Sequence, residues 1–315
     1  MKHVFVIDPE SFSGQQWRMD GLRDIIGQYF RTQEKPDFTT MVSKFPREAM
    51  GVIQKQVDEA GGDTVRVYAV GGDGVLFDCL NAIVGLPNTE LAIMPYGATN
   101  TFVRSFGEGT DEAFKNVPSV TTAPGIPTDV IEAGNTYAIS GCTVGFTPAV
   151  VIRIRDLNDA KLARGLGRLA AGLRRLFTGF SFVFDRDIVG RHYKIAIDDG
   201  DYSGTYSQIN ILNAPYFGRR KTALRETQPD DGFIDVVLFK SASVVTTLIN
   251  FRKYAQRKLP SSCIRVKAKK VEIQSDKPMW IQTDSEYLMD TNITFEVVPG
   301  AVQIVAVDNL KYQEH

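Results

Sequence analysis

A glycine-rich turn between an apolar run and a helical run constrains the fold of this chain more than any other stretch. The β-branched run 65–70 enters the sequence Gly-Gly-Asp-Gly at 71–74, and an apolar helix is expected to begin near Val75. Glycines let the backbone approach a ligand, and the unpaired N–H groups at a helix start favour phosphate. The phosphate contacts predicted for this turn are Gly71, Gly72, Gly74 and Val75. A tight strand-to-helix connection without a ligand is the alternative.

The carboxylate of this turn has a different predicted role. Asp73 would lie beside the bound phosphates, where a carboxylate suits a divalent metal or a hydroxyl proton better than phosphate itself. We therefore expect Asp73 to be catalytic.

A second polar loop follows the next buried run. The sequence MPYGATNTF at 94–102 comes after an expected strand at 91–94. Loops at the carboxyl ends of neighbouring strands form the ligand sites of open α/β sheets. The nucleotide contacts predicted here are Gly97, Ala98, Thr99 and Asn100. Asn100 is also suited to capping a short helix after it.

The order of these runs predicts the fold class. Expected strands at 4–7, 38–42, 65–70 and 91–94 alternate with expected helices at 16–29, 46–59 and 76–84. Such alternation is typical of a doubly wound, mainly parallel sheet. A stretch with three prolines, 117–128, marks a candidate boundary. We predict an α/β nucleotide-binding domain at 1–127 and a β-rich, sandwich-like domain at 128–301.

The second part of the chain consists mainly of short β-rich runs. They are expected at 192–197, 205–212, 264–274, 280–283, 293–298 and 302–307. One helical segment, 161–177, carries a stripe of leucines with basic residues nearly opposite. This segment could lie on an anionic membrane, or its leucines could pack on the second domain.

Composition excludes several other classes of protein. The 315-residue chain has 43% hydrophobic residues and a formal net charge of −1, which argues against a general nucleic-acid binder. Its three cysteines are far apart, so neither a zinc site nor a disulfide framework is indicated. No secretory signal and no long apolar run is found. We expect the cytoplasm as its location, with peripheral contact at the inner face of the membrane.

The two loops and four later segments together resemble a known family. The sequences GGDGVLFDCLNAIVG and PYGATNTFVRSFG are similar to motifs of the diacylglycerol kinase catalytic family, bacterial lipid kinases related to sphingosine kinases and NAD kinases. Further similarities are found at 127–147, at NAPYFG (213–218), at DDGFIDVV (230–237) and at DSE (284–286). The resemblance implies a site in the cleft between the domains, with residues 302–315 returning to the first domain.

The resemblance also implies chemistry. It predicts transfer of phosphate from ATP, with Mg²⁺, to the hydroxyl of diacylglycerol or a related lipid alcohol. Glu286 takes the place of the catalytic acidic residue of the family. Asp231 matches an aspartate that binds a structural Mg²⁺ together with the main-chain carbonyls at Gln228 and Phe233. An ordinary turn before a strand is the alternative reading of this segment.

Departures from the motifs keep other functions open. Val75, Ala98, Thr101 and Ser285 replace family residues that include carboxylates and hydroxyls. Losing a carboxylate near the metal or phosphate can slow a reaction by about 10²-fold or more. The alternatives are a catalytically inactive nucleotide- or lipid-binding protein, and a kinase of a soluble acceptor such as NAD. Whether the chain forms a homodimer is left open.

Overall fold

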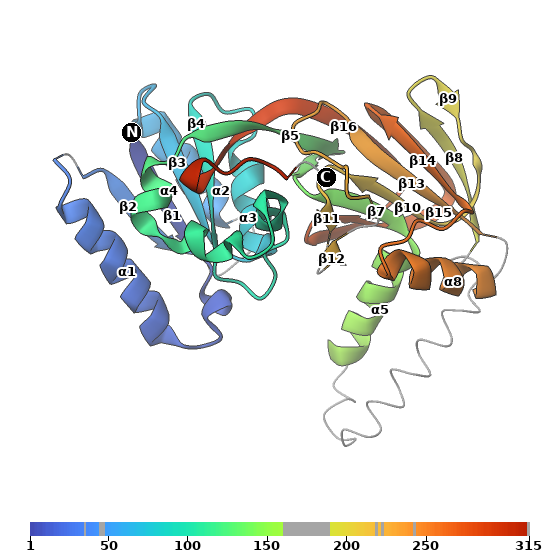
Figure 1. The fold of residues 1–315 in the computed structure, drawn as a ribbon, viewed down its shortest axis with the longest axis horizontal. Helices are drawn as coiled ribbons and strands as arrows, with labels where there is room; N and C mark the ends of the chain where they lie inside the picture. The colour runs from blue at the N-terminus through green and yellow to red at the C-terminus, as the bar shows by residue number, and fades with distance from the viewer. Residues whose placement is uncertain are drawn as a thin grey trace, which may run out of the picture.

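The fold joins a parallel half and an antiparallel half. The computed structural model describes residues 1–34, 36–43, 48–159, 190–217, 220–221, 224–241 and 244–313. Within these ranges one sheet of 14 strands passes through both halves, which lie side by side and are bridged by two long strands (Figure 1).

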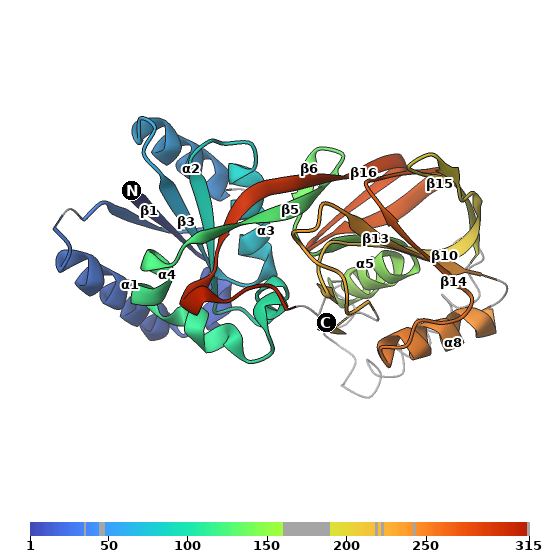
Figure 2. The same cartoon turned by 45° about the horizontal axis from the view of Figure 1, so that its top comes forward.

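Alternating strands and helices build the N-terminal half. The strands are β1 (Lys2–Ile7), β2 (Phe38–Val42), β3 (Val65–Gly71) and β4 (Thr89–Pro95), and the helices are α1 (Gln16–Arg31), α2 (Glu48–Glu59), α3 (Asp73–Ile83) and α4 (Val117–Thr122). The strands pair in parallel in the order β2-β1-β3-β4. Helix α2 contacts α3 and helix α1 contacts α4, on opposite sides of the sheet (Figure 2). The predicted doubly wound fold is confirmed.

Burial explains why these segments take these conformations. The inward residues of α1 are Met19, Leu22, Ile26 and Phe30, whose spacing of three and four places them on one helix face. All seven residues of β3 are buried, as expected for a central strand that is covered by helices on both sides. The apolar residues among them belong to the first hydrophobic core.

Antiparallel strands build the second half. They include β7 (Gly141–Gly145), β8 (Arg191–Ile197), β9 (Gly200–Asp201), β10 (Gly204–Leu212), β13 (Ile234–Lys240), β14 (Cys263–Ala268) and β15 (Lys270–Thr283). Their order is β14-β13-β10-β7-β15, with β8 paired to β10 and β15. Two short strands, β11 (Tyr216–Phe217) and β12 (Arg220–Lys221), pair separately, and the helices are α5 (Phe146–Asp159) and α8 (Val244–Ala255). A second hydrophobic core lies here, as the predicted β-rich, sandwich-like half requires.

Two strands connect the halves. Strand β16 (Glu286–Val305) runs antiparallel to β5 (Gly125–Ala133), which also pairs with β6 (Thr136–Ala138). Near its end β16 pairs in parallel with β4. Residues of the chain end, including Val307 and Tyr312, pack in the first core. The residue limits of the two domains remain a prediction.

Several expected elements differ from the structure. The proline-containing stretch 117–128, a candidate boundary, forms the short helix α4 and the start of β5. The expected strand 264–274 is interrupted at Lys269, where the main-chain N–H groups of Lys269 and Lys270 donate to the Asp198 carboxylate. The expected strand 293–298 and residues 302–305 of the expected strand 302–307 are parts of β16, with a bulge between Val298 and Val302.

Some predictions concern residues that are not described. The expected amphipathic helix 161–177 lies outside the described residues, as do Gly218 and Arg219 of the matched turn. A search of the described residues finds no helix that is both long enough and apolar enough to cross a membrane.

Candidate functional site

The glycine turn after β3 packs tightly against the second loop. A Cβ added to Gly97 would lie 2.3 Å from Gly72 Cα, and one added to Gly71 would lie 2.7 Å from a methyl carbon of Val75. A Cβ added to Gly74 would meet no atom within 4 Å. Gly71, Gly72 and Gly97 are therefore needed for loop packing, whereas Gly74 leaves the turn open to a ligand.

Asp73 joins the two loops. It is the first residue of α3, so the helix begins two residues before the expected Val75. The Thr101 N–H donates to Asp73 Oδ1 over 2.7 Å, and the Thr101 hydroxyl donates to Asp73 Oδ2 over 2.6 Å. The Asp73 N–H donates to the Thr99 carbonyl over 3.1 Å. These bonds fix the position of the carboxylate, although each of its oxygens keeps a lone pair for another partner.

A second carboxylate comes from the antiparallel half. Asp284 lies in the turn between β15 and β16 with φ of +48°. Its carboxylate accepts hydrogen bonds from the N–H groups of Ile139 (2.7 Å), Ser140 (3.0 Å) and Gly141 (3.0 Å). Burial raises the pKa of Asp284 to about 7, although these three bonds favour the charged form. The three hydrogen bonds therefore hold the turn at Asp284 against residues 139–141.

The two carboxylates line one pocket between the halves. The pocket has a volume of about 260 Å³. From the first half it is lined by Asp73, Gly74, Leu76, Thr99 and Thr101, and from the second by residues that include Ser140, Asp284, Ser285 and Tyr287. The Ser285 hydroxyl oxygen is buried and has no hydrogen-bond partner among the described residues. A ligand with a polar group would satisfy it.

Other predicted contacts lie around this pocket. Ala98 is exposed on the second loop. The Asn100 amide donates to the Gly97 carbonyl over 2.9 Å, while its oxygen is buried without a partner in the described part of the chain. Thr101, not Asn100, precedes the next short helix, Phe102–Phe106, so Asn100 stabilises the loop and does not cap that helix.

Glu286 is placed differently from Asp73. It is exposed at the start of β16, opposite Thr283, and among the described residues it does not line the pocket, although the following Tyr287 does. A larger hollow of about 1020 Å³ lies in the second half among β8, β9, β15 and β16. None of the predicted site residues lines that hollow, so we place the candidate site at the smaller pocket.

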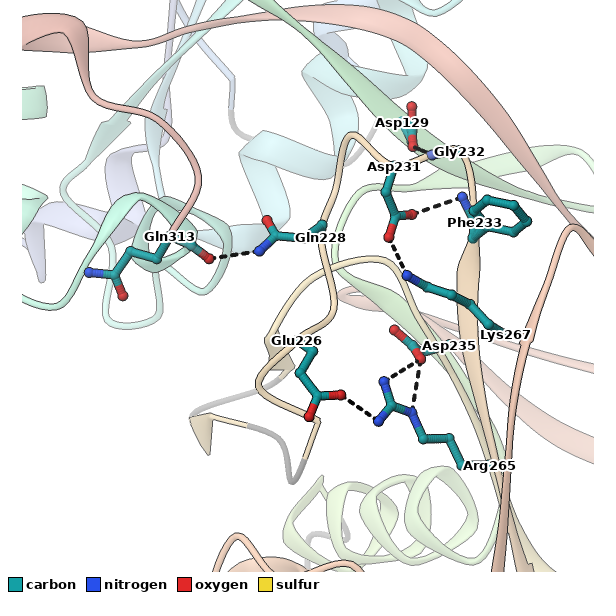
Figure 3. A network of polar contacts seen from close by, with 10 residues as sticks. All are labelled: Asp129, Glu226, Gln228, Asp231, Gly232, Phe233, Asp235, Arg265, Lys267 and Gln313. Atoms are coloured by element: carbon teal, nitrogen blue, oxygen red, sulfur yellow. Dashed lines mark hydrogen bonds and ion pairs between the residues drawn. The ribbon is translucent and has the colours of Figure 1, made fainter. Parts of the chain in front are cut away.

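The turn that was expected to bind a structural metal lies in another part of the second half. Lys267 Nζ is 2.5 Å from Asp231 Oδ2, and the Phe233 N–H donates to Asp231 Oδ1 over 3.0 Å (Figure 3). The Gln228 amide donates to the Gln313 carbonyl over 2.8 Å. Because an ammonium group already lies at this carboxylate, these residues as placed do not fit a divalent cation.

Sequence reasoning did not assign Thr101 or Asp284 to the site. Thr101 was noted as a departure from the family motif, and Asp284 as part of DSE. Thr101 could have been found from the sequence, because it carries a hydroxyl and directly follows the predicted contacts 97–100. No local signal shows that Asp284 binds residues about 145 positions earlier, since only the folded chain brings them together.

Comparisons with known proteins agree with this architecture. Residues 3–133 match the family model of the diacylglycerol kinase catalytic domain, and residues 186–306 match that of the YegS C-terminal NAD kinase beta sandwich-like domain. Together the two models span most of the chain.

Individual relatives have low sequence identity to this chain but match most of its length. A Staphylococcus aureus (strain Mu3) protein named "Putative lipid kinase" is 23% identical over 248 residues, which is 78% of each chain. A second protein, from the bovine strain RF122, is 24% identical over the same length. A solved structure, titled "A putative diacylglycerol kinase from Bacillus anthracis str. Sterne", superposes with a TM-score of 0.72 at 21% identity and covers 98% of both chains.

Proposed function

The chain belongs to the diacylglycerol kinase catalytic-domain family, and from this premise we propose that it transfers the γ-phosphoryl group of ATP to a hydroxyl of diacylglycerol or a related lipid alcohol. One observation carries the proposal. Asp73 from the parallel half and Asp284 from the antiparallel half line the same pocket, at the N-terminus of α3. Phosphoryl transfer needs such carboxylates beside a phosphate cradle.

The start of α3 supplies the cradle. Helix geometry leaves the N–H groups of Gly74 and Val75 without an acceptor inside the helix. The helix N-terminus also carries a partial positive charge, which favours the phosphates of ATP. Because the space beside Gly74 is open, a phosphate can approach the backbone there.

Carboxylate oxygens in the pocket suit a Mg²⁺ ion that arrives with ATP. Asp73 and Asp284 would hold it, since hard cations prefer oxygen ligands. When bound, the ion neutralises charge on the phosphates. Asp73, fixed by Thr101, meets it without having to reorient.

Glu286 is the base in this proposal. It accepts the proton of the lipid hydroxyl as the hydroxyl oxygen attacks the γ-phosphorus and ADP departs. Its exposure places it at the surface, where a lipid head group can approach it.

Lipid access would involve peripheral contact with a membrane. The segment 161–177, which lies outside the described residues, contains Arg164, Arg168 and Arg175. Each basic side chain near an anionic surface contributes roughly 1 kcal/mol of attraction. Changing all three to Gln should weaken co-sedimentation with phosphatidylserine vesicles at low salt and leave neutral vesicles unaffected. Equal sedimentation of both proteins would place any membrane contact elsewhere.

The test of the proposal is an acceptor panel with radiolabelled ATP and Mg²⁺. Mixed micelles would present diacylglycerol, monoacylglycerol or a sphingoid base, and separate reactions would contain NAD or glycerol. We expect label in the lipid fraction and its loss in Asp73→Asn. Label only in a soluble product would indicate a kinase of a soluble acceptor. No label in any product, with ATP still bound, would indicate an inactive nucleotide-binding protein.

A further inference from the structure

A lysine from a neighbouring strand lies at the turn 230–233. Strand β14 pairs with β13 so that Lys267 is opposite Asp235, and its ammonium group reaches back to Asp231 Oδ2. The same ammonium lies 5.8 Å from the centre of the Phe233 ring. Asp231 thus has a positive charge on one oxygen and the Phe233 N–H on the other (Figure 3).

The turn that carries this ion pair is tied to a buried carboxylate. The Gly232 N–H donates to Asp129 Oδ2 over 2.6 Å, and the Gly300 N–H donates to Asp129 Oδ1 over 2.8 Å. Asp129 is only 3% exposed and lies on β5. Gly300 lies at the bulge where β16 passes from one half to the other. A buried carboxylate without these donors would be costly, so the turn must stay in place.

The connection continues from Asp129 to the pocket. The Asn213 amide donates both to the Asp129 carbonyl (2.8 Å) and to the Ile139 carbonyl (2.9 Å). The Ile139 N–H donates to Asp284 Oδ2. An uninterrupted path of backbone and hydrogen bonds therefore leads from the Asp231 turn to a carboxylate of the candidate site.

We propose that Lys267 is a positioning residue: its ammonium group takes the place of a bound divalent cation at Asp231, so that the turn, Asp129 and Asp284 are held in position without a structural metal. A divalent cation at the same oxygen would be repelled by the ammonium group. Unlike a bound metal, the lysine cannot dissociate or be removed by a chelator.

The chain offers a matched control. Lys269 lies on the same edge and its ammonium is 5.5 Å from the Phe233 ring, but among the described contacts it makes no ion pair with Asp231. Lys269→Gln removes the same charge from the same region. Lys267→Arg keeps the charge and should restore what Lys267→Gln loses.

The experiment is thermal unfolding of the nucleotide-free full chain in EDTA and in Mg²⁺. It does not depend on the proposed kinase activity, so it can succeed or fail independently of that proposal. We expect the wild type and Lys269→Gln to melt at the same temperature in both buffers. Lys267→Gln should melt at least about 2 °C lower in EDTA and regain part of the loss with Mg²⁺, because ligand binding stabilises the folded state.

Three results would overturn the proposal. One is a wild-type protein whose melting temperature falls in EDTA and recovers with Mg²⁺. The second is a Lys267→Gln variant whose melting temperature in EDTA equals that of Lys269→Gln, or does not rise when Mg²⁺ is added. The third is a Lys267→Arg variant that melts as low as Lys267→Gln. Arginine keeps the positive charge, so it should restore the melting temperature if the charge, and not the packing of the lysine side chain, is what matters.

Discussion

Two Asp-Gly turns of this chain contain the same local sequence but have opposite surroundings. Asp73-Gly74 begins α3 and lies in the pocket, where the carboxylate is held by the neutral N–H and hydroxyl of Thr101. Asp231-Gly232 precedes β13, and its carboxylate faces the ammonium of Lys267. The first keeps its negative charge available to a ligand, whereas the second is already neutralised by the protein.

The comparison shows that the motif does not decide the role of the carboxylate. Neutral donors orient a carboxylate without cancelling its charge, so it can still bind a cation or influence a phosphate. A lysine ion pair offsets that charge. From these partner residues, Thr101 and Lys267, we infer a chemical role for the first turn and a structural role for the second.

The largest expected effect comes from removing the reactive carboxylate. Asp73→Ala should lower kinase turnover by roughly 10³-fold, because a group that acts on the transition state is lost. The two hydrogen bonds from Thr101 are also lost, and bonds to a charged group contribute roughly 1.5–3 kcal/mol each, so the melting temperature should fall as well. Turnover and thermal melting measure the two effects separately. Unchanged turnover in a folded variant would refute the role of Asp73.

The next effect concerns the exposed carboxylate at the start of β16. Glu286→Gln should lower kcat by about 100-fold and change the KM for ATP much less, because a base acts mainly in the transition state. Steady-state kinetics with varied ATP would show this. If the variant instead loses only nucleotide affinity, then the base is another residue, with Asp73 and Asp284 as the next candidates.

The raised pKa of Asp284 predicts a pH-dependent stability. Between pH 4 and pH 7 the folded state keeps the proton that the unfolded chain releases, because burial raises the pKa from 3.8 to about 7. The free energy of unfolding should therefore fall as the pH rises, by up to about 1.4 kcal/mol per pH unit, and level off above pH 7. Denaturation of wild type and Asp284→Asn at four pH values tests this. Parallel pH profiles would contradict it.

The smallest expected effect concerns Thr101, which is 4% exposed. Thr101→Val removes the hydroxyl that donates to Asp73 and leaves the N–H donor in place. A hydrogen bond to a charged group contributes roughly 1.5–3 kcal/mol, so a loss of about 10-fold in kcat is expected. Thr101→Ser should restore the rate. If the Ser variant is as slow as the Val variant, then packing and not the hydroxyl is responsible.

Local sequence located the glycine turn between β3 and α3. The glycines, the β-branched run before them and the helix after them all act within about 20 residues, so the turn around Asp73 could be located. The helix start differed by two residues because Asp73, not Val75, takes the first helical position. Gly71 and Gly97 stay predicted nucleotide contacts, and in the structure their lack of a side chain lets the two loops pack together.

The contacts of Lys267 and Asp284 depend instead on how distant strands pair. Lys267 reaches Asp231 because β14 pairs with β13 at one particular register, and a shift by one residue would turn this side chain to the other face of the sheet. The turn at Asp284 contacts residues 139–141 only after β15 and β7 have paired. No periodicity in the sequence reports such pairings. The 117–128 stretch, predicted as a candidate boundary, forms the short helix α4 and the start of β5, with Pro124 between them.

The most direct test of the central claim is one assay of two matched variants. Asp73→Asn and Asp231→Asn remove one charge each from the two Asp-Gly turns, and both are compared with wild type in lipid phosphorylation and in thermal melting. We predict that Asp73→Asn loses about 100-fold or more in kcat with a small change in melting temperature, whereas Asp231→Asn melts lower and keeps more of its kcat. The reverse pattern, or an equal loss of kcat in both variants, would contradict the division of the two turns into chemistry and structure.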